Sequence, residues 1–242
     1  PPMIAPGRKT IADMFRACDY TTAIIGKWHL GWDWTGKDGK PAKRIDDIDF
    51  TKRVANGPTD KGFDYFYGLT SPSGPPHLYL VNDMAEKQPN MVFEDSGGGL
   101  YKIKGVVGHS DWSAESMQPH LADKTLEYLD ENKDSDKPFF LYMALTAPHI
   151  PLFPSPEFKG KSKIGDYGDL VMMIDDIVGR INQKLKEIGK YDDTIVMFAA
   201  DNGCAGYINM GQINKKGHYP SYIYRGYKSH GWEGGHRIPF IL

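Results

Sequence analysis

The sequence lacks several features that would place it in a class at once. Only two of its 242 residues are cysteine, Cys18 and Cys204, which excludes a disulfide framework and leaves one pair or none. No apolar run approaches the roughly 18 residues of a membrane-spanning helix. With 29 Lys and Arg against 31 Asp and Glu, the net charge is −2. Composition therefore gives no electrostatic reason to expect nucleic acid or an anionic membrane as a partner.

Both ends of the sequence look internal to a longer chain. It begins with PPMIAPGRKT, without an initiator methionine or a signal-peptide pattern, and ends with RIPFIL, which is typical of a strand entering a core. Natural termini usually lie in exposed polar segments. We therefore expect residues 1–242 to be the central part of one larger domain, incomplete at both ends. The cellular compartment stays open.

A helix followed by an apolar strand is expected three times. The pairs are residues 10–19 with 20–26, 118–134 with 137–149, and 166–189 with 194–200. The third helix has the strongest signal, because apolar residues recur at steps of three and four: Leu170, Ile174, Ile177, Ile181, Leu185 and Ile188. Continuous apolar strands are typical of parallel sheets buried on both faces. The alternation predicts an α/β domain with a largely parallel central sheet.

Polar side chains follow each of the three predicted strands. Lys27 and His29 follow the first strand, His149 ends the second, and Asp201 and Asn202 follow the third. In open α/β sheets, ligands bind outside the carboxyl ends of the strands. If the strands are parallel, these side chains should gather at one edge of the sheet.

Taken singly, each cluster also has an ordinary structural interpretation. GKWHLG can hold a surface lysine and a packed histidine, and TAPHIP can be a rigid turn, because proline restricts the backbone on both sides of His149. ADNG is typical of a tight turn, although Asp201 and Asn202 also offer the hard oxygen atoms that Ca²⁺ and Mg²⁺ prefer.

A fourth cluster lies in the glycine-rich stretch YRGYKSHGWEGGHR. Its basic residues are Arg225, Lys228, His230, His236 and Arg237, and a solvated basic loop is the ordinary interpretation. Together with the other three clusters, however, it provides a metal site, lysines and histidines. This set suits a tetrahedral oxyanion such as sulfate or phosphate, because cations neutralise its oxygens and a histidine protonates a leaving oxygen.

Five motifs in this order resemble those of the type I sulfatases, the arylsulfatase-like members of the alkaline phosphatase superfamily. The motifs are YTTAIIGKWHLG, PFFLYMALTAPHIP, YGDLVMMIDDIVG, TIVMFAADNG and YRGYKSHGWEGGHRIPFI. GKWHLG resembles the second signature of the family, and the likeness covers essentially the whole chain. It implies an alkaline-phosphatase-like three-layer α/β sandwich with a largely parallel central sheet.

The resemblance implies a role for each of four catalytic residues. Lys27 looks like the lysine that contacts both the sulfate and the nucleophile. His29 looks like the histidine that hydrogen-bonds the nucleophile and helps to expel sulfate. His149 resembles the histidine that binds sulfate and protonates the departing alcohol. Lys228 matches the second sulfate-binding lysine, so Lys27, His149 and Lys228 are the expected substrate-binding residues.

The resemblance also implies a metal site. Asp201 and Asn202 match the second half of the family's calcium site, and Mg²⁺ is the other possible ion. A further family serine near the active site corresponds to Ser71 or Ser73, and the sequence does not decide between them.

The sequence departs from the family pattern at the nucleophile. In this family the nucleophile is a formylglycine, made by a maturation enzyme from the first residue of a Cys/Ser-X-Pro-X-Arg stretch. Neither Cys18 nor Cys204 lies in such a stretch. The paired aspartates that complete the calcium site are also missing before Lys27. We expect both groups in a preceding segment, so residues 1–242 alone should be inactive.

The expected function is hydrolysis of a sulfate monoester, with release of inorganic sulfate from a sulfated carbohydrate. Two alternatives remain open. One is a phosphodiesterase or phosphonate monoester hydrolase of the same superfamily, and the other is a non-catalytic homologue that binds sulfated glycans. No nucleic-acid partner is expected, and the resemblance implies export to periplasm, medium or lysosome.

Overall fold

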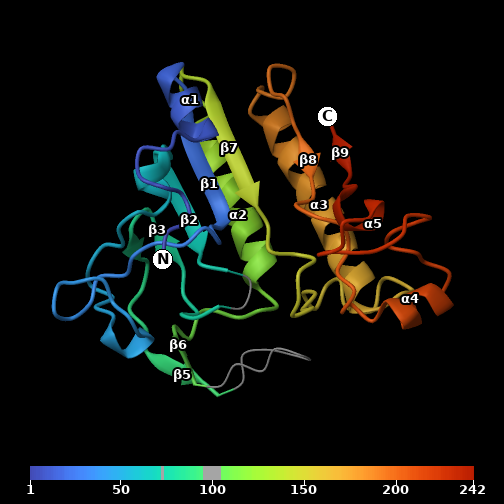
Figure 1. Cartoon of the computed structure of the whole chain (residues 1–242). Helices are drawn as coiled ribbons and strands as arrows, with labels where there is room; N and C mark the ends of the chain where they lie inside the picture. Colours follow the sequence, from blue (N-terminus) through green and yellow to red (C-terminus); the bar gives the residue numbers. More distant parts are fainter. Residues whose placement is uncertain (72–73, 95–104) are drawn as a thin grey trace. The chain divides into compact units, whose positions relative to one another are not determined.

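The computed structural model describes residues 1–71, 74–94 and 105–242 (Figure 1). These residues form two compact units, Pro1–Ala147 and Pro148–Leu242. The elements of the first unit are α1 (Ile11–Ala17), β1 (Thr21–Lys27), η1 (Ile45–Asp47), η2 (Pro58–Lys61), β2 (Tyr65–Leu69), β3 (Leu80–Val81), β4 (Met84–Ala85), β5 (Met91–Phe93), β6 (Val106–Gly108), α2 (Met117–Glu131) and β7 (Phe139–Ala144).

A five-stranded sheet organises the first unit. Its order is β4-β3-β2-β1-β7, and β1 runs parallel to both β2 and β7, whereas β3 is antiparallel to β2 and β4. Figure 1 shows β1 and β7 side by side and pointing the same way. The expected parallel pairing of strands 20–26 and 137–149 is confirmed, and the carboxyl ends of these two strands lie at the same edge.

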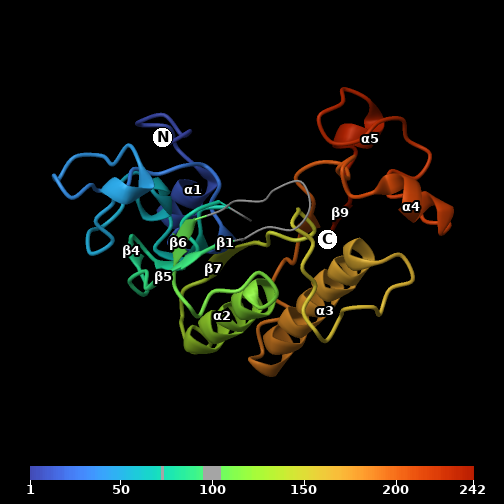
Figure 2. The ribbon, with the colours of Figure 1, turned by 90° about the horizontal axis from the view of Figure 1, so that it is seen from below.

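Helices cover both faces of this sheet, which gives the first unit three layers (Figure 2). Successive residues of a strand point to opposite faces. Ile24 accordingly joins the core that contains Ala12 of α1, whereas Ile25 joins the core that contains Leu121 of α2. All four of these side chains are fully buried. The continuous apolar run in β1 therefore reflects burial on both faces, as the sequence predicts.

The helices α1 and α2 end within a few residues of the predicted bounds. Thr10 caps α1 with a capping box, because its Oγ1 accepts a hydrogen bond from the Asp13 backbone N–H and the Asp13 carboxylate accepts one from the Thr10 N–H. The helix–strand alternation does not indicate β2, because a single 3₁₀ turn, η2, precedes it instead of an α-helix. The strands β3 to β6 have only two or three residues each, too few for a periodic signal.

The second unit contains one long helix and short elements. These are α3 (Asp166–Glu187), β8 (Phe198–Ala199), α4 (Met210–Lys215), α5 (Glu233–His236) and β9 (Phe240–Ile241). The predicted helix is confirmed as α3. Leu170, Ile174, Ile177 and Leu185 of its apolar stripe are buried, and the two other stripe residues are half-buried.

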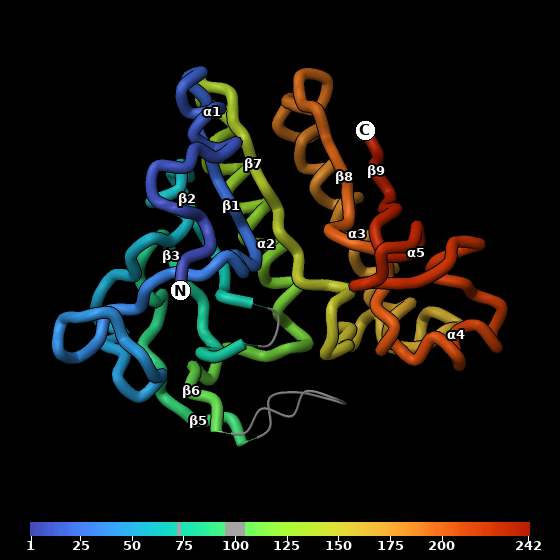
Figure 3. The backbone as a smooth tube through the Cα atoms, in the orientation of Figure 1, coloured from blue at the N-terminus to red at the C-terminus, as the bar shows by residue number. Residues whose placement is uncertain are grey.

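The prediction for residues 194–200 is wrong in two respects. Only Phe198–Ala199 forms a strand, and it pairs antiparallel with β9 instead of joining the five-stranded sheet (Figure 3). Ile195 and Met197 are 78% and 62% exposed, so this run is not buried on both faces. A strand is enclosed only where neighbouring strands flank it on both sides. Among the described strands, β8 pairs with β9 alone, so its other side has no neighbouring strand. The RIPFIL segment does form β9, but its side chains are exposed.

A buried carboxylate fixes the loop that precedes α3. Asp169 of α3 accepts hydrogen bonds from the backbone N–H groups of Gly160 and Ser162, at 2.7 and 2.6 Å. Burial alone would raise the pKa of this carboxyl group, but the N–H donors outweigh it and the pKa lies below its ordinary value.

In the described ranges, no helix is both long and apolar enough to cross a membrane.

Candidate active site

Two glycines allow three strands to come together just before Lys27. A Cβ on Gly26 would lie 2.0 Å from the carbonyl oxygen of Ala144 in β7, and a Cβ on Gly68 of β2 would lie 1.8 Å from that of Gly26. Gly26 also has φ +130°, a conformation that side chains with a Cβ rarely adopt. The glycine that ends the apolar run therefore permits close packing at the sheet edge from which Lys27 emerges.

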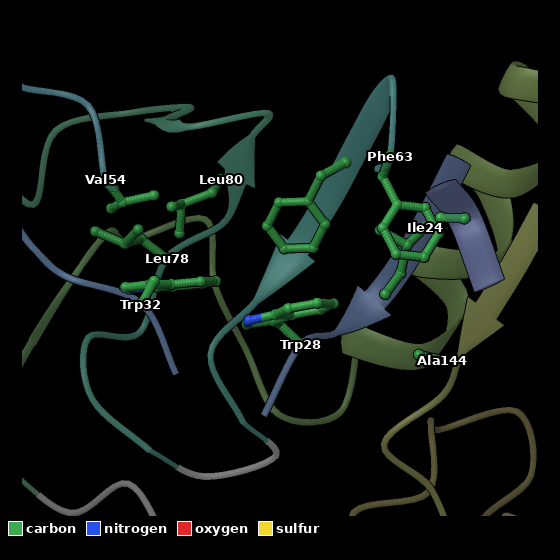
Figure 4. Close-up of a cluster of buried hydrophobic side chains, with 10 residues drawn as sticks. Ile24, Trp28, Trp32, Val54, Phe63, Leu78, Leu80 and Ala144 are labelled. Atoms are coloured by element: carbon green, nitrogen blue, oxygen red, sulfur yellow. The ribbon is translucent and has the colours of Figure 1, made fainter. Parts of the chain in front are cut away.

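Trp28 anchors the segment between the two predicted catalytic residues of this unit. Its ring is buried beside Phe63, and its Nε1–H donates to the carbonyl oxygen of Gly31 at 2.8 Å (Figure 4). Lys27 is half-buried and His29 is exposed. The interpretation of a packed histidine is therefore wrong, and the buried side chain of this motif is the tryptophan.

The backbone holds His29 in a left-handed conformation next to the end of β2. Its φ is +52°, and its N–H donates to the carbonyl oxygen of Thr70 at 2.8 Å. Ser71 follows directly, and its hydroxyl accepts a hydrogen bond from the N–H of Gly74 at 2.8 Å. Ser71 is thus next in sequence to the residue that pairs with His29. Ser73, the other candidate serine, lies outside the described residues.

In the second unit, the ADNG turn packs against the glycine-rich loop. The N–H of Gly203 donates to the carbonyl oxygen of Gly235 at 2.9 Å, and the N–H of Lys228 donates to that of Cys204 at 2.8 Å. A Cβ on Gly203 would lie 2.0 Å from the carbonyl oxygen of Gly234. Two segments far apart in sequence, one carrying Asp201 and Asn202 and the other carrying Lys228, are therefore held together.

His149 is attached to the same part of the second unit. Its neighbour Ile150 packs in a small core with Ile208 and Ile213, which follow the ADNG turn. The centroid of the His149 ring lies 6.4 Å from that of the Tyr207 ring. His149 Nδ1 lies 2.5 Å from the carbonyl oxygen of Ile150. A carbonyl oxygen only accepts, so Nδ1 is the hydrogen-bearing nitrogen in this contact. Tyr207 was not among the predicted site residues, because no motif includes it.

The donor atoms of Asp201 and Asn202 fit a hard cation in kind. Asp201 is exposed and makes no hydrogen bond or ion pair with any described residue. The Asn202 amide donates through Nδ2 to the carbonyl oxygen of Gly203 at 2.9 Å, which leaves Oδ1 as an acceptor. Ca²⁺ takes six to eight oxygen ligands, so these two residues supply only part of a site. Among the described residues, no group of three or more His, Cys, Asp and Glu side chains is placed to hold a metal.

The surroundings of Cys204 are unlike those of a nucleophilic cysteine, whereas Cys18 is simply exposed. Both are free. Cys204 is half-buried with its Sγ 3.2 Å from the Ser221 hydroxyl. Burial raises the pKa of the Cys204 thiol, and the contact with Ser221 only partly offsets this, so the reactive thiolate is disfavoured.

Four of the six predicted site residues thus lie on segments of the second unit that contact one another: His149, Asp201, Asn202 and Lys228. Lys27 and His29 lie side by side in the first unit, at the end of β1. The family model described as Sulfatase matches residues 2–242.

Two relatives and one solved structure are similar over nearly the whole chain. An N-acetylgalactosamine-6-O-sulfatase of Bacteroides thetaiotaomicron is 30% identical over 99% of this chain and 53% of its own length. An arylsulfatase of Hemicentrotus pulcherrimus is 31% identical over 96% of this chain and 37% of its own length. The solved structure, a sulfatase from work on glycosaminoglycan metabolism by Bacteroides thetaiotaomicron, has a TM-score of 0.80 and 27% identity, over all of this chain and 55% of that one.

The chain therefore spans about half, or less, of the length of the relatives that it matches. The mixed α/β fold with its mostly parallel central sheet matches the alkaline-phosphatase-like fold of the solved sulfatase. Because the family model covers the sequence almost from end to end, the chain belongs to the sulfatase family.

Proposed function

We propose that the protein containing this chain is a sulfuric ester hydrolase, and that residues 1–242 are the central part of its catalytic domain. The reaction breaks the bond between sulfur and the ester oxygen and yields inorganic sulfate and an alcohol. The observation that carries the proposal is the match to the sulfatase family over residues 2–242, which includes every predicted site residue.

Lys27 and Lys228 are the proposed sulfate-binding cations. A sulfate ester carries one negative charge, spread over three oxygen atoms, and fixed ammonium groups stabilise the charge that develops in the transition state. Lys27 is held at its base by the pairing of β1 with β2 and β7, and Lys228 by its backbone hydrogen bond to Cys204. The main chain thus fixes the base of each lysine before the substrate arrives.

His149 is the proposed acid for the leaving group. With Nδ1–H directed to the carbonyl oxygen of Ile150, protonated His149 donates from Nε2 to the ester oxygen as the sulfur–oxygen bond breaks. This step avoids release of an alkoxide. His29, at the end of β1, is the proposed partner of the nucleophile and assists the departure of sulfate from it.

Asp201 and Asn202 are proposed as two ligands of a divalent cation, Ca²⁺ or Mg²⁺. When bound, such a cation would act as a Lewis acid on a sulfate oxygen. The nucleophile is proposed to be a formylglycine outside residues 1–242, produced by a maturation enzyme, because this chain contains no Cys-X-Pro-X-Arg or Ser-X-Pro-X-Arg stretch.

The proposed substrate is a sulfated carbohydrate. Support comes from relatives whose names state that they are N-acetylgalactosamine-6-sulfatases, from Bacteroides thetaiotaomicron and from mammals.

The test is turnover of an aryl sulfate by the full-length protein, with and without a chelator, alongside a phosphate diester and a phosphonate monoester of the same alcohol. We expect metal-dependent sulfate release and a strong preference for the sulfate ester. Lys27→Ala should lower kcat/KM by about 100-fold or more, as loss of one transition-state charge contact does. Lys52→Ala, at an exposed lysine of the same unit, is the matched control and should stay within about two-fold.

Two results would replace the proposal. Faster turnover of the phosphate diester or of the phosphonate monoester would indicate a phosphodiesterase or a phosphonate monoester hydrolase. Absence of turnover on all three esters, together with binding of a sulfated sugar, would indicate a non-catalytic homologue.

A further inference from the structure

The glycine-rich loop of the second unit carries exposed aromatic rings next to guanidinium groups. We call Tyr222, Tyr224, Arg225, Trp232 and Arg237 the aromatic–arginine surface. The side chains of Tyr222 and Trp232 are 73% and 51% exposed. A group of exposed aromatic side chains commonly marks an interaction site, because leaving apolar rings in contact with water is unfavourable unless a ligand covers them.

Each arginine of the surface lies over a ring. The guanidinium carbon of Arg225 is 3.9 Å from the centroid of the Trp232 ring, and that of Arg237 is 4.7 Å from the Tyr224 ring. The rings of Tyr222 and Tyr224 meet edge to face at 6.3 Å. A guanidinium that stacks through one face keeps its N–H edge free, and this edge matches the two oxygens of a sulfate or carboxylate.

The backbone beneath the surface is tied together. The N–H of Gly234 donates to the carbonyl oxygen of Arg225 at 2.9 Å. The N–H of Gly235 donates to the carbonyl oxygen of Trp232 at 2.7 Å. Gly226 has φ +89°, and a Cβ there would lie 3.0 Å from the Trp232 Cβ. Tyr222 itself has φ +50°, a strained conformation for a bulky residue. The rings are thus placed by the fold, which lowers the entropy lost on binding.

The charge of this segment is opposite in sign to that of the whole chain. Residues 215–237 contain five Lys and Arg residues and one acidic residue, Glu233, whereas the chain has a net charge of −2. Arg237 pairs with Glu233 at 3.1 Å. Arg225 has no carboxylate within ion-pair distance in the described part of the chain. An anionic ligand would supply the missing partner.

We propose that the aromatic–arginine surface binds a second anionic sugar residue, next to the one whose sulfate is removed. The apolar C–H face of a sugar ring suits Tyr222 and Trp232, and its sulfate or carboxylate suits Arg225. The ADNG turn packs against Gly234, whose N–H donates to the carbonyl oxygen of Arg225, so the surface adjoins the segments that carry Asp201 and Lys228. The inference rests on the proposed function and makes the substrate an anionic oligosaccharide.

The test compares two substrates in the full-length protein, a chondroitin sulfate tetrasaccharide and a small aryl sulfate. The readout is the ratio of their kcat/KM values. Arg225→Gln should lower this ratio roughly ten-fold, since it removes a charged hydrogen bond, and the loss should be in KM. Tyr222→Ala should lower it roughly three- to ten-fold through lost stacking. Lys215→Gln, at an exposed lysine of α4, is the matched control and should leave the ratio within about two-fold.

Binding measurements separate this inference from the proposed function. Calorimetric titration of the sulfated tetrasaccharide, the unsulfated but carboxylated one and neutral chitotetraose needs no turnover. We expect binding of both anionic sugars, weakened by Arg225→Gln, and little binding of the neutral one. If aryl sulfate turnover fails while this pattern holds, the proposed function is lost and the surface remains.

Three results would overturn the inference. Unchanged ratios in both variants would show that the surface is not used. Equal losses on both substrates would show that Arg225 serves the sulfate site alone. Equal binding of chitotetraose and the anionic sugars would show that charge is not recognised. Thermal unfolding of each variant checks that the loop change has not unfolded the protein.

Discussion

The two units hold their predicted site residues in different ways. In the first unit, Lys27 extends a strand that is paired on both sides and buried on both faces. In the second, Asp201 and Lys228 lie in irregular segments that meet through backbone hydrogen bonds and glycine contacts. The difference indicates that the position of Lys27 depends on the stability of a core, whereas that of Lys228 depends on a few close backbone approaches.

The largest expected effect is on the stability of the core that supports Lys27 in the first unit. Ile24 of β1 is fully buried, whereas Ile11 of α1 is 58% exposed. Ile24→Ala should lower the free energy of unfolding by about 2–5 kcal/mol, because it leaves a cavity between β1 and α1. Ile11→Ala is the same change at an exposed site and should cost below about 1 kcal/mol. Chemical denaturation measures both, and equal losses would refute the core assignment.

A buried histidine provides a second test in the first unit. His77 stacks on Trp112 at 4.0 Å, and burial lowers its pKa to about 4. Between pH 6.5 and about 4 the unfolded chain therefore binds more protons at this position than the folded one, so stability falls as pH falls. Over this range His77 should account for about 3 kcal/mol of the loss.

Replacement of this histidine by phenylalanine isolates its contribution. His77→Phe keeps a ring against Trp112 and removes the titrating group. Its free energy of unfolding should therefore fall less steeply than that of the parent protein between pH 6.5 and 4, as measured by denaturation at each pH. Identical slopes would contradict the assigned shift.

The third prediction concerns the second unit, where moving the ADNG turn should change activity more than stability. Gly203→Ala would push the ADNG turn away from Gly234, and a displacement of about 1 Å can cost about 100-fold in rate. We expect such a loss in kcat/KM with little change in melting temperature. The control is Gly211→Ala, the same change in α4, where a Cβ meets no atom within 4 Å. A Gly203 variant with full activity would break the comparison between the units.

Local patterns in the sequence were sufficient to predict α1, β1, α2 and β7 of the first unit and α3 of the second. The periodicity of α3 needs only neighbours three and four residues apart, and the buried run of β1 correctly indicated a strand with two covered faces. The same reasoning failed for residues 194–200, because enclosure of a strand depends on partners that its own sequence does not contain. The apolar run of β1 and that of residues 194–200 look alike in sequence, so the sequence alone does not tell which of them is enclosed.

The site was predictable in composition and less so in arrangement. The positions of Lys27 and His29 at the end of a strand followed from the sequence, and so did the polar turn at Asp201. The approach of Gly26 to Ala144 depends on the register of three strands, which no local pattern specifies. The contact between the Gly203 turn and Gly235 likewise joins segments about 30 residues apart. These long-range backbone contacts determine where the side chains can act.

The measurement that tests the central claim most directly is the release of inorganic sulfate by the full-length protein and its Lys228→Ala variant. Ion chromatography detects sulfate itself, so the readout does not depend on a coloured alcohol. We predict sulfate release equal to the alcohol formed, a loss of about 100-fold in Lys228→Ala, and no more than a two-fold change in the exposed-lysine control Lys215→Ala. Full activity in Lys228→Ala, or no sulfate from the parent protein, would contradict the account.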